Sequence, residues 1–170
     1  LRSRHRNLLR AENQRKLILF NSPKNMSNTS NLIDNSRPLD LICMGRVAVD
    51  FYAEQVHSPL EDAQSFRKYL GGCARNTAVG TARLGLKSAM FSCVGADDMG
   101  VYLRNVLTNE GVDTSLLRNT PEHLTALVLL GVSPPDRFPL IFYRENCADM
   151  QILPSDANPE IFKNAKALLI

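Results

Sequence analysis

Residues that could hold a ligand lie at four places in this 170-residue chain. Two adjacent glycines, Gly71 and Gly72, stand directly before a helical pattern, and Asn76 follows within it. Glycine permits a positive φ and a close backbone approach, and a helix N-terminus presents unpaired N–H groups to oxygen atoms. This turn therefore either binds a ligand or simply joins a strand to a helix.

Two charged residues extend the candidate site, because each follows an apolar run that predicts a strand. The carboxylate of Asp50 can accept hydrogen bonds from ligand hydroxyls, or it can cap a turn. The forked guanidinium of Arg144 suits a carboxylate or phosphate, or it can pair with Glu145 on the surface. As a set, Asp50, the glycine turn, Asn76 and Arg144 suit a small polyhydroxylated acid, with Arg144 on the carboxylate.

The elements that must position these residues alternate between strands and helices. Apolar runs predict strands at 39–44, 88–94, 126–132, 140–143 and 167–170, with strand-like pieces at 51–56 and 66–70. Helical spacing and end signals predict helices at 76–84, 99–110 and 159–164. For Asp97 and Asp98, before the second helix, capping is favoured over catalysis.

This alternation predicts an α/β fold with a largely parallel sheet and helices on both faces. The segment between the strand-like pieces is expected to form a small flap over the site. Because an apolar strand runs to the last residue, we expect the sequence to continue beyond Ile170.

Composition excludes several classes of protein. Residues 1–38 hold eight of the 20 Lys/Arg and two of the 17 Asp/Glu, so the basic excess belongs to this leader and not to a nucleic-acid-binding body. No apolar run reaches the roughly 20 residues that span a bilayer. Four widely spaced cysteines, without CxxC pairs, indicate reduced thiols in a cytoplasmic protein and no zinc site.

The leader, residues 1–38, is rich in Arg, Asn and Ser and is expected to be disordered. Its arginines weakly suggest an organellar transit peptide, although the asparagines do not. Since Met26 is the first methionine, residues 1–25 can equally be sequence upstream of the natural start. The ordered domain is expected at 39–170.

Motifs of several enzyme classes are absent from the sequence. No GxGxxG follows the first strand, and neither GxxxxGK[ST] nor GxSxG occurs. The histidines, His5, His57 and His123, stand apart, so a surface role is favoured over catalysis. An NAD-dependent oxidoreductase would have only the alternation of strands and helices in its favour.

The stretch from Gly71 to Ala78, followed by Gly85 and Gly95, resembles the N-terminal motif of the ribokinase-like (PfkB) carbohydrate kinases. The resemblance covers about residues 39–170, including Gly45 to Asp50 and Val94 to Gly100. It implies a ribokinase-like three-layer sandwich, truncated at the C-terminus. It also implies a small β lid formed by residues 51–70 and the strands within 126–143, through which homodimers can form.

Several stretches resemble most closely the subfamily that phosphorylates 5-dehydro-2-deoxy-D-gluconate at its C6 hydroxyl in myo-inositol catabolism. They are 60–62, which precede Phe66, then 81–88 and 138–149. The resemblance implies substrate contacts by Asp50, Gly71, Gly72 and Asn76, and places Arg144, beside Tyr143, where related 2-keto-3-deoxygluconate kinases bind a carboxylate. Cys73 and Ala74 depart from the subfamily's usual Ser-Pro, so a hydroxyl contact would be lost.

The family's catalytic Gly-Ala-Gly-Asp stretch has no match in residues 1–170. ATP and Mg²⁺ are implied as cofactors, but their binding residues are not expected in this chain. We therefore expect a chain that binds the sugar acid and is inactive alone. The alternatives are a kinase for 2-keto-3-deoxygluconate or another sugar, and a non-catalytic sugar-binding module. No metal site, nucleic acid or membrane partner is expected.

Overall fold

The computed structural model describes residues 33–170, and most of the predicted leader lies outside this part of the chain. Residues 34–38 form a turn that is attached to the folded body. Asp34 accepts a hydrogen bond from the Ser36 amide, and Arg37 donates one to the carbonyl oxygen of Ala165 at 2.7 Å. The helices described here are too short or too polar to span a lipid bilayer.

Four parallel strands form the first sheet in the order β5–β4–β1–β8. They are β1 (Leu39–Met44), β4 (Ser88–Gly95), β5 (Leu117–Thr120) and β8 (Ala165–Leu169). Ile42 of β1 lies opposite Ala89 of β4 on one side and Leu168 of β8 on the other. Every residue of β4 is buried, which explains its almost unbroken apolar sequence.

Successive strand residues point to opposite faces of this sheet, so its apolar side chains form a core on each face. Helices cover both of these cores. On one face, α2 (Cys73–Arg83) and α3 (Asp98–Asn109) pack against Cys43, Met90 and Val94. On the other, Ile42 and Phe91 pack with residues of α4 (Pro159–Lys163). The short helices η3 (Ala148–Met150) and η4 (Pro154–Asp156) precede α4. The predicted α/β architecture is confirmed.

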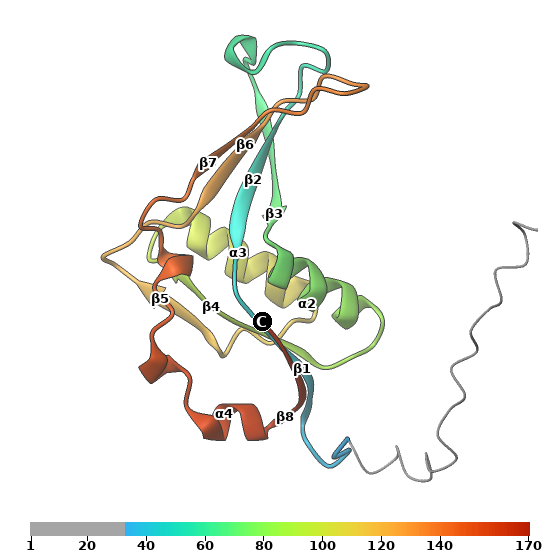
Figure 1. The fold of residues 1–170 in the computed structure, drawn as a ribbon, viewed down its shortest axis with the longest axis vertical. Helices are drawn as coiled ribbons and strands as arrows, with labels where there is room; N and C mark the ends of the chain where they lie inside the picture. Colours follow the sequence, from blue (N-terminus) through green and yellow to red (C-terminus); the bar gives the residue numbers. More distant parts are fainter. Residues whose placement is uncertain (1–32) are drawn as a thin grey trace, which may run out of the picture. The chain divides into compact units, whose positions relative to one another are not determined.

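The second sheet, which we call the lid, has the strand order β3–β2–β6–β7. Its strands are β2 (Ala48–Ala53), β3 (Phe66–Gly71), β6 (Leu127–Leu130) and β7 (Leu140–Tyr143). β2 is antiparallel to β3 and parallel to β6, and β6 is antiparallel to β7. The lid projects away from α2 and α3 in Figure 1, with η2 (Leu60–Asp62) at its far end.

The register of the lid decides which side chains share a face. Paired residues point to the same side, so one row consists of Tyr69, Asp50, Val128 and Phe142. The next row, on the opposite face, consists of Leu70, Val49, Leu127 and Tyr143. Val49 is buried in the core beneath α2 and α3. Asp50 therefore points away from that core.

Several observed elements differ from the predicted ones, and three of these differences are described here. Helix α2 begins at Cys73 and not at 76, because its first turn carries few apolar side chains and gave no periodic signal. Strand β5 was not predicted, since Leu117 is its only apolar residue and the strand lies at the edge of the sheet. Asp50 lies within β2 and not beyond a strand end.

Candidate functional site

The glycine turn joins the last residue of β3 to the first residue of α2. A Cβ on Gly71 would lie 2.0 Å from Oδ1 of Asp50, and one on Gly72 would lie 2.2 Å from the carbonyl oxygen of Arg46. Gly72 also has a φ of 112°, which glycine adopts readily. Both glycines are therefore needed for contacts within the chain itself, which bring the turn against Asp50.

Asp50 is half-buried, and its Oδ1 has no hydrogen-bond partner among the described residues. Burial raises the pKa of this carboxyl group, while the charges of Arg46 and Arg75 act against the rise. A buried acceptor without a partner is costly, and a ligand hydroxyl would satisfy it. The predicted proximity of Asp50 to the glycine turn is confirmed.

Arg75 supports the turn, although sequence reasoning did not single it out. It is buried, and its guanidinium donates hydrogen bonds to the carbonyl oxygens of Leu70 and Gly71. An arginine in the first turn of a helix gives no signal that distinguishes it from an exposed one. Arg75 can make these hydrogen bonds because the end of β3 lies beside the first turn of α2.

Arg144 pairs with a carboxylate that the sequence did not point out. Its Nε lies 2.7 Å from Oδ2 of Asp149, and not beside the expected alternative partner, Glu145. The Asp149 side chain is fully buried, and its Oδ1 has no partner within residues 33–170. Burial raises the pKa of Asp149, and Arg144 opposes that rise. The pair uses Nε, and within residues 33–170 the terminal nitrogens of Arg144 make no other hydrogen bond.

Two predicted residues are placed apart from Asp50. Tyr143 is 56% exposed and lies on the lid face opposite Asp50. Its neighbour Phe142 lies on the same face as Asp50. The side chain of Asn76 is exposed and lines a hollow with Tyr69 and Tyr102. The structure therefore brings together Asp50 and the glycine turn, and places Tyr143 and Asn76 outside that contact.

Arg46 is the further residue that sequence reasoning missed. It follows Gly45, the first residue after β1, and its guanidinium lies over the ring of Phe142, 5.6 Å from the centroid. It also lines a cavity of about 310 Å³ at the carboxyl ends of β1 and β8, beside the N-terminus of α2. Ligands of open α/β sheets commonly bind at such strand ends.

The cysteines do not add a redox or metal site to this region. All four are free thiols, as predicted, and only Cys73 is exposed. Burial raises the pKa of Cys43 to about 11. Over residues 33–170, no three His, Cys, Asp or Glu side chains are grouped so that they could hold a metal ion.

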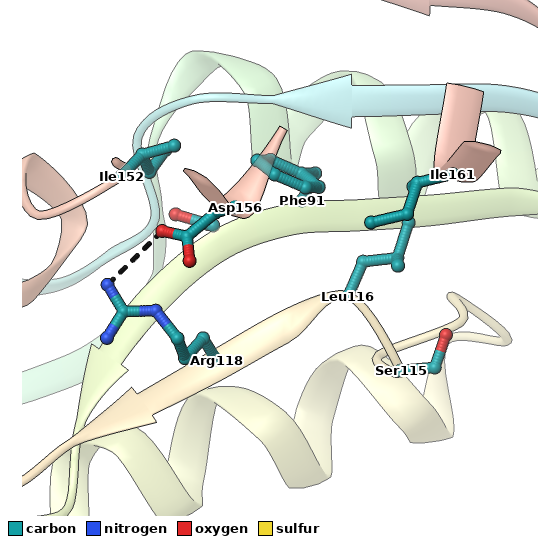
Figure 2. Close-up of a pocket in the computed structure, with 8 residues that line it drawn as sticks. Phe91, Ser115, Leu116, Arg118, Ile152, Asp156 and Ile161 are labelled. Atoms are coloured by element: carbon teal, nitrogen blue, oxygen red, sulfur yellow. Dashed lines mark ion pairs between the residues drawn. The ribbon is translucent and has the colours of Figure 1, made fainter. Parts of the chain in front are cut away.

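A second cavity, of about 280 Å³, lies on the other side of the parallel sheet (Figure 2). Arg118 of β5 reaches across it to Asp156, 3.4 Å away, while Leu116 and Ile161 form its apolar end. Arg118 also donates a hydrogen bond to the carbonyl oxygen of Gln151. These contacts attach the segment before α4 to β5. None of the predicted site residues lines this cavity.

Comparison with known proteins places this geometry among sugar kinases. A model of the pfkB family of carbohydrate kinases matches residues 39–170. A 5-dehydro-2-deoxygluconokinase of Geobacillus kaustophilus is 36% identical over 138 residues, which are 81% of this chain and 41% of that protein. The chain thus spans about two fifths of the length of this relative.

Solved structures agree with the sequence comparison. The PfkB protein of Polaromonas sp. superposes with a TM-score of 0.73 at 32% identity, over 76% of this chain and 44% of that one. An uncharacterized sugar kinase of Pyrococcus horikoshii, in complex with ATP, superposes with a TM-score of 0.70 at 30% identity, over 75% and 41% of the two chains.

Proposed function

Because this chain belongs to the pfkB family of carbohydrate kinases, we propose that it binds the sugar acid in an ATP-dependent phosphorylation. The substrate we propose is 5-dehydro-2-deoxy-D-gluconate, phosphorylated at its C6 hydroxyl. The name of the similar Geobacillus protein supports this choice. So does a site that combines hydroxyl-binding and carboxylate-binding groups.

The observation that carries the proposal is the Asp50 carboxylate, held against the glycine turn with a buried oxygen that has no hydrogen-bond partner in the described part of the chain. A sugar hydroxyl donating to this oxygen would make a charge-assisted hydrogen bond in a partly dry environment. We propose that the Gly71–Gly72 backbone and Asn76 contact neighbouring hydroxyls. Arg144, which follows Tyr143 in the sequence, is proposed to bind the carboxylate.

Phosphoryl transfer depends mainly on positioning and on stabilising charge. In this proposal, the residues of the chain contribute the positioning of the sugar. Family membership implies ATP and Mg²⁺ for the reaction. The described residues offer no group of three metal-binding side chains, and we assign no residue here to either cofactor.

The experiment is calorimetric titration of the purified 170-residue chain with 5-dehydro-2-deoxy-D-gluconate, 2-keto-3-deoxygluconate and D-fructose. We expect the tightest binding for the first. Tighter binding of 2-keto-3-deoxygluconate would assign the chain to the other acid, and tighter binding of fructose would contradict a sugar-acid site. Asp50→Asn should weaken binding of every sugar by about 10-fold or more, because a charged acceptor is lost.

We also propose that the chain binds without phosphorylating, because it contains no match to the family's Gly-Ala-Gly-Asp stretch. A coupled assay should detect no ADP release that depends on the sugar. Sugar-dependent ADP release, abolished by Asp50→Asn, would contradict this part of the proposal and leave the binding proposal standing.

A further inference from the structure

Charged side chains of alternating sign run from the glycine turn to the end of β7. Arg75 donates to the carbonyl oxygen of Gly71, which lies against Asp50. The backbone of Arg46 lies against Gly72, and its guanidinium lies over Phe142, two residues before Arg144, which contacts Asp149. Three arginines thus alternate with two aspartates, and Arg46 occupies the middle of the series. When all five are ionised, the series carries one net positive charge.

The outer two arginines already have partners within the fold. Arg75 donates to the carbonyl oxygens of Leu70 and Gly71, and Arg144 holds the buried carboxylate of Asp149 at 2.7 Å. Arg46 differs from both. Within residues 33–170, its guanidinium makes no hydrogen bond or ion pair and rests on the exposed face of Phe142.

The position of Arg46 also directs it toward a ligand. Its backbone is pressed against Gly72, and its side chain is half-buried at the cavity beside Cys73 and Thr77. A guanidinium that is partly desolvated, stacked and unpaired is suited to bidentate recognition of a carboxylate. Within residues 33–170, Asp50 and Asp149 each have a buried oxygen without a hydrogen-bond partner, so each can accept a further hydrogen bond.

We propose that Arg46 is the residue that selects the acidic sugar, by pairing with the substrate carboxylate between Asp50 and Asp149. This inference rests on the proposed function and deepens it. Arg144, restrained by Asp149, then acts beside Arg46 as a second donor. One bound carboxylate balances the one net positive charge of the series, whereas a neutral sugar leaves Arg46 unpaired.

The test measures binding of two ligands, 5-dehydro-2-deoxy-D-gluconate and the neutral 2-deoxy-D-glucose, to the unaltered chain and to Arg46→Met. Methionine keeps an apolar chain over Phe142 and removes the charge. We expect the acid to bind about 10- to 100-fold more weakly to the variant, as for loss of a charge-assisted pair. Binding of 2-deoxy-D-glucose should change less than about threefold. Arg46→Lys should recover part of the loss, since it restores the charge without the fork.

Arg83→Met is the matched control, because Arg83 is 66% exposed, pairs with Glu110 and lies at the far end of α2, about 16 Å from Gly72 along the helix. It should leave binding of both ligands unchanged. If Arg46→Met weakens both ligands equally, or leaves the preference for the acid intact, Arg46 is not the selecting residue and the inference is wrong. An unaltered chain that shows no preference for the acid would instead contradict the proposed function.

Discussion

At the scale of single residues, the site depends on how closely the glycine turn approaches Asp50. No side chain fits at Gly71, because a Cβ there would lie 2.0 Å from Oδ1 of Asp50. The carboxylate is thereby fixed at the turn and partly removed from water. The same burial that prepares Asp50 for a hydroxyl makes its ionised form costly in the absence of ligand.

Gly71→Ala is expected to lower the free energy of unfolding by about 1–3 kcal/mol, the usual cost of forcing an extra carbon into a filled space. Sugar binding should weaken as well, because Asp50 must move. The matched control is Gly80→Ala, since a Cβ at this exposed helical position would meet nothing within 4 Å. The control should raise stability by about 0.5–1 kcal/mol. Equal stability of the two variants, measured by urea denaturation, would refute the close contact.

Asp50→Asn is expected to stabilise the free chain at pH 7 while weakening sugar binding. The pKa of Asp50 is raised by burial, so the folded chain releases this proton less readily than the unfolded chain. The ionised carboxyl therefore lowers stability as pH rises through its folded-state pKa, and the asparagine variant escapes this loss.

The measurement is urea denaturation of both chains between pH 3 and pH 8. The stability advantage of Asp50→Asn should shrink as the pH falls and the wild-type carboxyl is protonated. An advantage that does not depend on pH would show that burial of the charge is not its cause.

At the scale of elements, Asp97 connects the parallel sheet to the lid. Its Oδ1 accepts hydrogen bonds from the amides of Met99 and Gly100, at 3.0 and 2.8 Å, and so caps α3. Its Oδ2 accepts one from the amide of Thr125, just before β6, at 2.8 Å. One side chain thus fixes both the start of a helix and the entry to a lid strand, and the predicted capping is confirmed.

Asp97→Ala should therefore cost at least about 1–2 kcal/mol, the range for loss of a helix cap. The neighbouring carboxylate offers a control, because Asp98 is exposed and lies in the first turn without these contacts. Asp98→Ala should change stability by no more than about 0.5 kcal/mol. Chemical denaturation measures the free energy of unfolding of both variants. Similar losses of stability would mean that the negative charge at the helix start matters and the specific contacts of Asp97 do not.

Strand β7 presents four large apolar side chains, all of them exposed, at the edge of the lid. We propose that lids of two chains pair through the face that bears Ile141 and Tyr143, since the opposite face carries Asp50. Ile141→Lys should then convert a dimer to a monomer in light scattering after size-exclusion chromatography. Leu140→Lys, on the Asp50 face, should leave the dimer intact. A chain that is monomeric before any substitution would contradict the proposal.

At the scale of the whole described body, the sequence was sufficient for the architecture and for only part of the site. Apolar runs such as 88–94 predicted strands, and helical spacing such as that in 76–84 predicted helices. Both are local signals that a sequence shows directly. Asp50 and the glycine turn were also found, because glycine pairs before a helix are visible in the sequence.

The partners of the charged residues could not be predicted in the same way. Arg46 and Asp149 are far apart in the sequence, and their proximity follows from the lid register and the return of the chain after β7. Glu145 was the nearest acid to Arg144 in sequence, but the chain beyond β7 turns into η3, which brings Asp149 to it. The family resemblance placed Tyr143 with Arg144 in the site, whereas strand alternation turns Tyr143 to the lid face opposite Asp50.

The most direct test of the central claim, that the site lies at the glycine turn, is to map amide chemical shifts while 5-dehydro-2-deoxy-D-gluconate is titrated into the 170-residue chain. We predict that the largest changes fall on Arg46, Asp50, Gly71, Gly72 and Arg144. Changes confined to Ser92, Leu116 and Arg118, which line the cavity in Figure 2, would contradict it.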